Sequence, residues 1–312
     1  MVVHNRQLIV LSLFCFLASG FAVSQDKSKS AENDVFVKAN LLVLDSNKKP
    51  IDDVKSADVK IFEDGVPQQM TYFRKKLPKT NLGLLVDNSG SMRLGLNSVE
   101  TALVSLSDQL LENSELFLIR FISRDKITVE QDWTADKAML VEAVKNLYID
   151  GGQSAVIDAI YLATEKLFER ERKNKEQRHA IILISDAEDR DSYYSFEEMI
   201  KPFKDSDIQV FVISFAENAP LEKKKARSLG ARIALETGGT IITLPQKYKT
   251  EDVTTALRAV MIEIRSPFVF GYKSTNSKRD GIPRNITVEI ADGPNGEKRF
   301  GIVRGSLVIP KK

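Results

Sequence analysis

The sequence predicts an α/β protein: a Rossmann-like, mainly parallel sheet with helices on both faces, flanked by a small β-rich domain. Short apolar runs alternate with amphipathic helical patterns from about Asn81 to Arg265. The stretches before and after this region show only strand and turn patterns. Hydrophobic residues make up 43% of the 312 residues, which is enough to fill a packed core.

The first 24 residues have the pattern of a secretory signal. His4 and Arg6 precede an apolar run that ends in Ala22-Val23-Ser24. We expect cleavage near Ser24, which predicts a secreted or periplasmic protein with no transmembrane span after cleavage. The bulky residue before Cys15 argues against lipoprotein processing. Residues 25–33 are polar and are expected to form a flexible tether.

Charge and reactive side chains exclude several kinds of function. The chain has 45 Lys+Arg against 43 Asp+Glu, a balance that does not favour nucleic-acid binding. It has one Cys and two His, and signal cleavage would leave only His179. Cysteine-ligated zinc, iron–sulfur clusters and disulfide frameworks are therefore excluded, and any metal ion must be held mostly by oxygen. The charge run 169–178 is expected to be a solvated helix end and loop.

The N-terminal stretch, 34–79, reads as antiparallel strands. Apolar alternation marks strands at 35–44, 58–62 and 66–73, and Glu63-Asp64-Gly65 has turn composition. These residues are too few to bury a core by themselves.

The central stretch, 80–265, carries the alternating pattern. Buried-type strands are expected at 82–86, 116–121, 181–184, 210–215 and 240–244, and an extra edge strand at 127–133. Helices are expected at 98–112, 135–147, 156–172, 196–205, 221–236 and 251–264. In such a sheet a ligand site belongs at the carboxyl ends of the strands.

The C-terminal stretch, 266–312, returns to strand patterns at 268–272, 285–290 and 301–309. We expect these strands to pair with the N-terminal ones, so that an inserted α/β domain splits one β domain. Trp133 and the phenylalanines are expected in the core.

The strongest local feature is the segment after the first central strand. The strand delivers Asp87 at its end, and the loop then offers Ser89 and Ser91. Three oxygens at this spacing can turn toward one point, which suits a hard divalent cation such as Mg²⁺. The alternative is a helix N-cap cluster, because Asp and Ser are also the preferred residues there.

Two further strand ends add oxygen ligands. Asp186 follows the apolar strand 181–184, and Ser154 lies in the Gly-rich loop before the helix at 156. Carboxyl ends of parallel strands meet at one edge of a sheet, so these residues are expected close to Asp87. Five oxygen-bearing residues at one edge are hard to assign to capping alone.

Asp87-x-Ser89-x-Ser91, with Ser154 and Asp186, resembles the metal-ion-dependent adhesion site (MIDAS) of von Willebrand factor type A (VWFA) domains, over about Asn81–Arg265. Segments 62–65 and 152–159 are similar to secreted VWFA-related proteins common in acidobacteria. The resemblance implies that Ser89 and Ser91 bind the cation directly. Asp87 and Asp186 would contribute directly or through water. Ser154 stands where the family usually has Thr, and Ala187 where Gly is usual.

The resemblance further implies adhesion or interaction through a bound Mg²⁺ (or Mn²⁺ or Ca²⁺), completed by an Asp or Glu carboxylate of a partner protein. Glu188, Asp189 and Asp191 are expected to form a solvated acidic loop beside this site. The alternative is a structural or envelope-assembly protein whose metal site is degenerate.

Two enzyme classes fit less well. A phosphatase of the D-x-D type needs a second carboxylate where Ser89 stands. A serine hydrolase built on Ser154 needs a small residue in place of Val156, and His179 precedes Asp186 in the chain and is expected in a loop. We therefore expect no catalytic residues.

Overall fold

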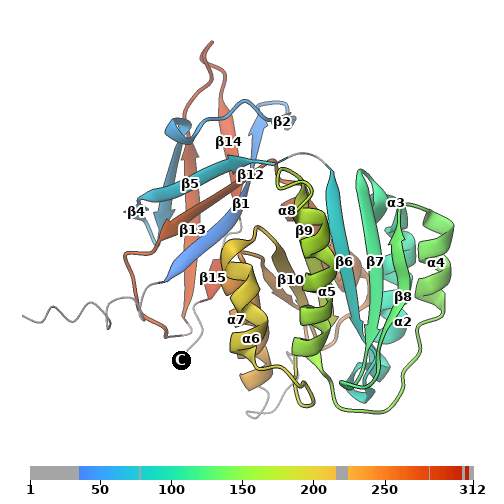
Figure 1. Ribbon diagram of the computed structural model, residues 1–312. Helices are drawn as coiled ribbons and strands as arrows, with labels where there is room; N and C mark the ends of the chain where they lie inside the picture. The colour runs from blue at the N-terminus through green and yellow to red at the C-terminus, as the bar shows by residue number, and fades with distance from the viewer. Residues whose placement is uncertain (1–34, 77–78, 216–223, 281, 304–305, 309–312) are drawn as a thin grey trace, which may run out of the picture. The chain divides into compact units, whose positions relative to one another are not determined.

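The computed structural model describes residues 35–76, 79–215, 224–280, 282–303 and 306–308 (Figure 1). The predicted signal, 1–24, and tether, 25–33, lie outside these residues. Within the described part, every helix is too short or too polar to cross a bilayer.

A six-stranded sheet forms the central stretch. Its strands are β6 (Thr80–Asp87), β7 (Ser114–Phe121), β8 (Ile127–Thr134), β9 (Arg178–Ser185), β10 (Gln209–Ser214) and β11 (Ile241–Thr243). They lie in the order β11-β10-β9-β6-β7-β8. The predicted edge strand, 127–133, is confirmed as β8 at the end of this order. It pairs antiparallel with β7, whereas all other neighbours are parallel.

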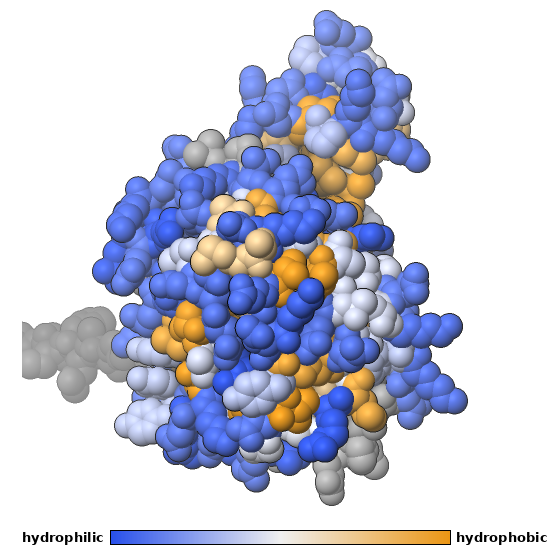
Figure 2. All heavy atoms as spheres, turned by 90° about the vertical axis from the view of Figure 1, so that its right-hand side faces the viewer, coloured by the Kyte–Doolittle hydropathy of each residue, from blue (hydrophilic) through white to orange (hydrophobic). Residues whose placement is uncertain are grey.

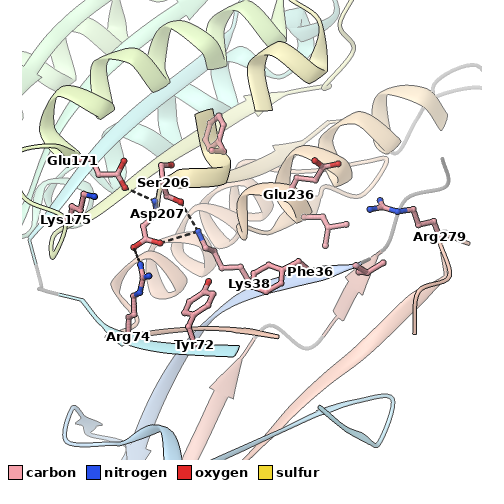
Figure 3. A pocket seen from close by; sticks show the side chains of 13 residues that line it. Phe36, Lys38, Tyr72, Arg74, Glu171, Lys175, Ser206, Asp207, Glu236 and Arg279 are labelled. Atoms are coloured by element: carbon pink, nitrogen blue, oxygen red, sulfur yellow. Dashed lines mark hydrogen bonds and ion pairs between the residues drawn. The ribbon is translucent and has the colours of Figure 1, made fainter. Parts of the chain in front are cut away.

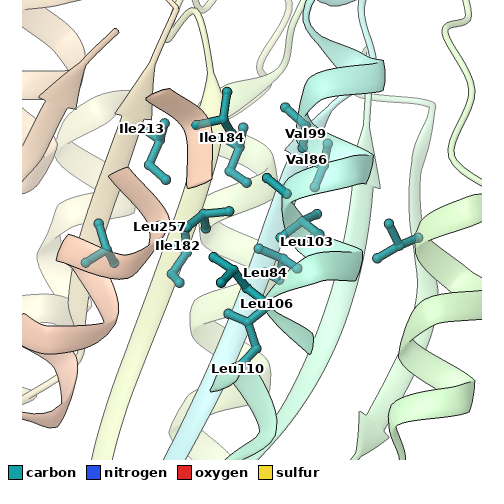
Figure 4. Packing of buried hydrophobic residues seen from close by; sticks show 14 of the residues in the cluster. Leu84, Val86, Val99, Leu103, Leu106, Leu110, Ile182, Ile184, Ile213 and Leu257 are labelled. Carbon is teal, nitrogen blue, oxygen red and sulfur yellow. The ribbon is translucent and has the colours of Figure 1, made fainter. Parts of the chain in front are cut away.

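Helices cover both faces of this sheet, as predicted. They are α2 (Leu96–Ser105), α3 (Ser107–Leu111), α4 (Lys137–Lys145), α5 (Val156–Glu171), α6 (Phe196–Ile200), α7 (Lys224–Thr237) and α8 (Thr250–Arg265). On one face, Leu84 and Val86 of β6 pack against α2 and α8 (Figure 4). On the other, Leu85 packs in a second cluster with α5, α6 and α7. Successive strand residues point to opposite faces, so one strand supplies both cores.

Two predicted helices differ from the structure. The helix expected at 98–112 is broken at Leu106 into α2 and α3. The helix expected at 196–205 ends at Ile200 and continues as the 3₁₀ segment η3 (Lys201–Asp205). Pro202 lacks the backbone N–H that would continue the α-helical hydrogen bonding.

The flanking strands form two antiparallel sheets, which confirms the predicted pairing of N- and C-terminal strands. One contains β14 (Arg299–Val303), β1 (Phe36–Asp45), β12 (Phe268–Lys273) and β5 (Met70–Lys75), with β2 (Pro50–Ile51) paired to β1. The other contains β15 (Ser306–Val308), β13 (Pro283–Ile290), β3 (Val59–Glu63) and β4 (Val66–Gln68). Both ends of the chain contribute to one apolar cluster, because neither end could bury a core alone.

A buried ion pair joins the two ends of the chain in this β-rich part. Glu63 and Arg284 are each about 2% exposed, and their Oε1 and Nη1 atoms lie 2.9 Å apart. Tyr272 and Ser274 donate hydrogen bonds of 2.8 Å to the two carboxylate oxygens of Glu63. The turn after Glu63 has φ of 50° at Asp64 and 77° at Gly65, as a two-residue hairpin with positive φ at both positions requires.

The charge run 169–178 is the end of α5 and the loop before β9, and most of its residues are at least partly exposed, as expected. Arg178, its last residue, is an exception. Arg178 begins β9 and is only 3% exposed. Its guanidinium donates to Asn40 Oδ1, Gln209 Oε1 and the Ser266 carbonyl, joining β1, β10 and the segment after α8. The burial of Arg178 could not be predicted, because these acceptors are distant in the sequence.

A second charge cluster lies around Asp207, just before β10. Its carboxylate is bonded to Lys76 at 2.9 Å and Arg74 at 2.8 Å, and Lys38 lies 3.6 Å away. Burial alone would raise the pKa of Asp207, but these cations outweigh burial and lower it to about 2.

Asp207 should therefore make folding stability depend on pH. A carboxylate with a pKa lowered on folding stabilises the protein above its unfolded value near pH 4, and the contribution is lost as the pH falls toward 2. We expect Asp207→Asn to reduce the free energy of unfolding by about 2 kcal/mol at pH 7. Urea unfolding between pH 7 and pH 3 should show the difference shrinking as the pH falls. A pH-independent difference would contradict this assignment.

Two aromatic side chains depart from the expected core. Phe36 is 48% exposed and Phe300 is 55% exposed, both on strands of the β-rich part. Trp133 packs against the second core cluster, as expected. The face that carries β8 and α4 is mostly hydrophilic, and its apolar atoms lie in separate small areas (Figure 2).

Candidate metal centre

The candidate site lies where β6 and β9 end. The two strands are parallel neighbours, with Val86 opposite Ile184, so Asp87 and Asp186 reach the same edge of the sheet. In the sheet, β7 lies on one side of β6 and β9 lies on its other side, so the chain changes direction across the sheet between β7 and β9. This reversal of strand order opens a crevice at the carboxyl ends, where α/β sheets place their ligands.

Four of the five predicted residues form a connected cluster of oxygens. Ser154 Oγ lies 3.1 Å from Asp87 Oδ2 and 2.9 Å from Ser89 Oγ. Ser89 Oγ in turn lies 3.0 Å from Ser91 Oγ. Asp87, Ser89 and Ser154 are buried, and Ser91 is exposed. The cluster can therefore be reached from solvent on the Ser91 side.

Asp186, the fifth residue, is buried at the same edge of the sheet. Its Oδ1 accepts a hydrogen bond of 3.1 Å from the backbone N–H of Glu188, which orients the carboxylate within its loop. Its negative charge also raises the pKa of Asp87. The second carboxylate therefore acts electrostatically on the oxygen cluster.

The electrostatics of the site suit a cation. Burial raises the pKa of Asp87 to about 6, although hydrogen bonds from Ser185 and Ser89 oppose the rise. Two neighbouring buried carboxylates are costly without a compensating positive charge. Among the described residues, no group of three His, Cys, Asp or Glu side chains is arranged to hold a metal. A metal at this edge would therefore depend on serine hydroxyls, which are hard oxygen donors.

Helix capping does not account for the serines. Ser89 precedes the 3₁₀ segment η2 (Gly90–Leu94), but its side chain makes no capping hydrogen bond. The helix α5 begins after Ala155, and its N-terminus is capped by a residue from another loop. The Ile157 N–H donates a hydrogen bond of 3.1 Å to Asp189 Oδ1. The hydroxyls of Ser89 and Ser154 are directed to each other instead.

Sequence reasoning missed Ser185. Its hydroxyl donates a 2.6 Å hydrogen bond to Asp87 Oδ2 and accepts the Ala187 N–H at 2.9 Å. A hydroxyl ending an otherwise apolar buried strand needs a partner, and this was the available signal. Ser185 thus positions Asp87 and helps to shape the loop that carries Asp186.

The loop after Asp186 is fastened to the domain and is not a solvated acidic loop, which corrects that expectation. Asp189 receives a backbone N–H of α5, and Asp191 forms an ion pair of 2.8 Å with Arg124. Both are partly buried. Ala187 has φ of 56°, a left-handed conformation that favours glycine. Alanine is strained in this conformation, which glycine adopts freely.

His179 is not placed to serve Ser154. It is a buried residue of β9 and not a loop residue, which corrects the expectation. Its Nε2 lies 3.1 Å from the Asn174 carbonyl, at the start of the strand. Six residues of extended strand, roughly 20 Å, separate this position from the carboxyl end of β9. Ser154 is instead bonded to Asp87 and Ser89.

A mainly parallel sheet with helices on both faces and Asp/Ser-rich loops at its carboxyl edge places the central stretch in the class of doubly wound α/β domains. Residues 81–256 match the family model of the von Willebrand factor type A domain, and the chain belongs to this family. Type A domains are typically protein-binding or adhesion modules and are usually non-catalytic.

Similar proteins extend the comparison without identifying a function. An uncharacterized protein of Synechocystis sp., sll0103, is 34% identical over 116 residues, which are 36% of this chain and 26% of that protein. The chain thus spans about a quarter of this relative's length. An aerotolerance-related membrane protein from Bacteroides fragilis is 19% identical, with a TM-score of 0.46, and the match covers 59% of this chain and 98% of that one. Proximal thread matrix protein 1 of the mussel byssus, with a zinc-occupied MIDAS motif, is 14% identical, with a TM-score of 0.47. This match covers 65% of this chain and 50% of that one.

Proposed function

We propose that the protein binds a partner protein in a divalent-cation-dependent manner. The observation that carries the proposal is the cluster of Asp87, Ser89, Ser91 and Ser154 oxygens beside Asp186. Bound Mg²⁺, Mn²⁺ or Ca²⁺ would supply an open coordination position for a partner's Asp or Glu carboxylate.

The protein's own residues would prepare this contact. Ser89, Ser91 and Ser154 would contribute only neutral hydroxyls to the cation. Its charge of +2 would then be balanced by no more than the two carboxylates of Asp87 and Asp186. Ser185 would orient the Asp87 carboxylate by donating a hydrogen bond of 2.6 Å to its Oδ2. Ser91 is the exposed member of the cluster and marks the side on which a partner would approach. Recognition would then be a local contact and would not require an extended charged surface.

Titration calorimetry with Mg²⁺, Mn²⁺ and Ca²⁺ tests the cation site. We expect saturable binding of one ion, reversed by a chelator. A protein that binds none of the three would support the alternative, a structural or envelope-assembly module with a degenerate site. Affinity capture from an envelope extract, with Mg²⁺ or with chelator, would then test partner binding: a partner retained equally in both would contradict cation dependence.

We also propose that residues 1–24 are a cleaved export signal, that 25–33 form a tether, and that 80–265 are a domain inserted between 34–79 and 266–312. The segments 62–65 and 152–159 support a relationship to secreted VWFA-related proteins of acidobacteria. A mature protein that retains residues 1–24 would contradict export by cleavage.

A further inference from the structure

A cavity of about 860 Å³ lies between the outer face of β1 and β5 and the region of α5, η3 and α7 (Figure 3). Asp207, which lines it, precedes β10. The cavity is therefore at the amino ends of the parallel strands, at the opposite edge of the sheet from the candidate metal centre. Its volume is in the range of sites for small organic ligands.

Two polar atoms of the cavity residues are buried without a hydrogen-bond partner in the described part of the chain. They are Tyr72 Oη and Arg279 Nε. Buried polar groups are nearly always paired in native proteins, so two such donors in one cavity are informative. Burial raises the pKa of Tyr72, which keeps its hydroxyl protonated and able to donate.

The cavity is lined by four cations, Lys38, Arg74, Lys175 and Arg279, and three carboxylates, Glu171, Asp207 and Glu236, which leaves an excess of one positive charge. Glu171 accepts the backbone N–H of Asp207 at 2.7 Å. Asp207 is already neutralised by Lys38, Arg74 and Lys76. Glu236 forms an ion pair of 3.0 Å with Arg232. The remaining lining cations, Lys175 and Arg279, have no ion pair with another described residue. An anion is thus favoured over a cation in this cavity.

The middle of the cavity is apolar and aromatic. Phe36 is half exposed, and its ring lies 6.1 Å from that of Tyr72 in a stacked arrangement. Val35, Phe203 and Leu235 also line the cavity. Tyr72 and Arg279 lie on opposite sides of Phe36 (Figure 3). A half-exposed phenylalanine between two unpaired donors forms a platform for a flat or apolar group.

We propose that this cavity binds an elongated organic dianion: an aromatic or apolar middle over Phe36, with an acidic group at each end. One acidic group would accept hydrogen bonds from Tyr72 and be attracted by Lys175. The other would accept from Arg279. This site is separate from the proposed cation site and does not depend on it.

Naphthalene-2,6-dicarboxylate is a rigid fluorescent probe of this shape. Fluorescence titration of the full chain in chelator, with 2-naphthoate as the one-carboxylate comparison, tests the proposal without involving the cation site. We expect saturable binding of one dicarboxylate, and weaker binding of the monocarboxylate. Arg279→Gln should weaken dicarboxylate binding about tenfold, since it removes a charge-assisted hydrogen bond. Tyr72→Phe keeps the ring, removes the hydroxyl and should weaken it about threefold.

Arg258→Gln is the matched control, because Arg258 is an exposed cation that lines a different cavity. It should bind the dicarboxylate like the unaltered protein. Thermal unfolding of each variant checks that the fold is intact. The proposal would be overturned if the unaltered protein showed no saturable binding, or if Arg279→Gln and Tyr72→Phe bound the probe as tightly as the unaltered protein. It would also be overturned if Arg258→Gln weakened binding as much as the two cavity variants do.

Discussion

Glu63→Ala should lower the free energy of unfolding by about 3–5 kcal/mol, because it leaves the buried guanidinium of Arg284 without its carboxylate. The loss extends beyond one ion pair, since Tyr272 and Ser274 also donate to Glu63. Arg284 additionally donates to the carbonyls of Asn276 and Lys278, so the segment between β12 and β13 depends on its position. The pair joins strands from both ends of the chain.

Chemical denaturation of the variant and the unaltered protein measures this effect. Asp292→Ala is the matched control, because Asp292 pairs with Lys298 at 2.6 Å with both side chains well exposed. Exposed pairs contribute at most about 1 kcal/mol, so this control should have little effect. If Glu63→Ala cost no more than Asp292→Ala, the buried network would not be a main support of the β-rich part.

Asp87→Asn should weaken the affinity for the cation by about a hundredfold or more, while the protein stays folded. Asparagine keeps the shape of the side chain, and serine hydroxyls can donate or accept, so the contacts with Ser89, Ser154 and Ser185 can persist. The substitution removes a carboxylate whose ionised form is penalised by burial. We therefore expect the cation-free variant to be at least as stable as the unaltered protein.

Calorimetry with Mg²⁺ or Mn²⁺, combined with thermal unfolding, separates these effects. Cation at a hundred times its dissociation constant should stabilise the unaltered protein by about 2.7 kcal/mol and leave Asp87→Asn unchanged. Asp136→Asn is the control, because Asp136 caps α4 and Asn caps equally well. Unaltered cation affinity in Asp87→Asn would remove Asp87 from the site, whereas a collapse in stability would assign it a structural role.

Most strands and helices of the central stretch, 80–265, could be predicted from the sequence. Each expected central strand is present, because buried parallel strands are continuous apolar runs that differ sharply from amphipathic helices. The errors lie where local composition is ambiguous. Leu106 falls inside a regular apolar stripe, yet the helix breaks there. The expected strand 66–73 is likewise two strands, β4 and β5.

The residues of the candidate site could be chosen from sequence because each follows a recognisable strand or opens a helix. Their contacts could not. Ser154 is 67 residues from Asp87 in the chain, and Ser185 is 98 residues away. The parallel pairing of β6 with β9 brings Ser185 to Asp87. Ser154 is brought there by the loop before α5, whose backbone is hydrogen-bonded to Asn88 and Ile122. A hydroxyl at the end of a buried strand indicates that Ser185 needs a partner, but the sequence does not show that this partner is Asp87.

Hydrophobic periodicity and residue type predict the fold class, the order of strands and helices, and the oxygen-rich character of the candidate site, because both are local properties of the chain. Which charges are buried depends on the folded arrangement. Glu63, Arg178 and Asp207 look like ordinary surface residues in the chain, but each meets partners supplied by distant segments. Burial and electrostatic pairing depend on those distant segments, so they appear only when the chain is folded.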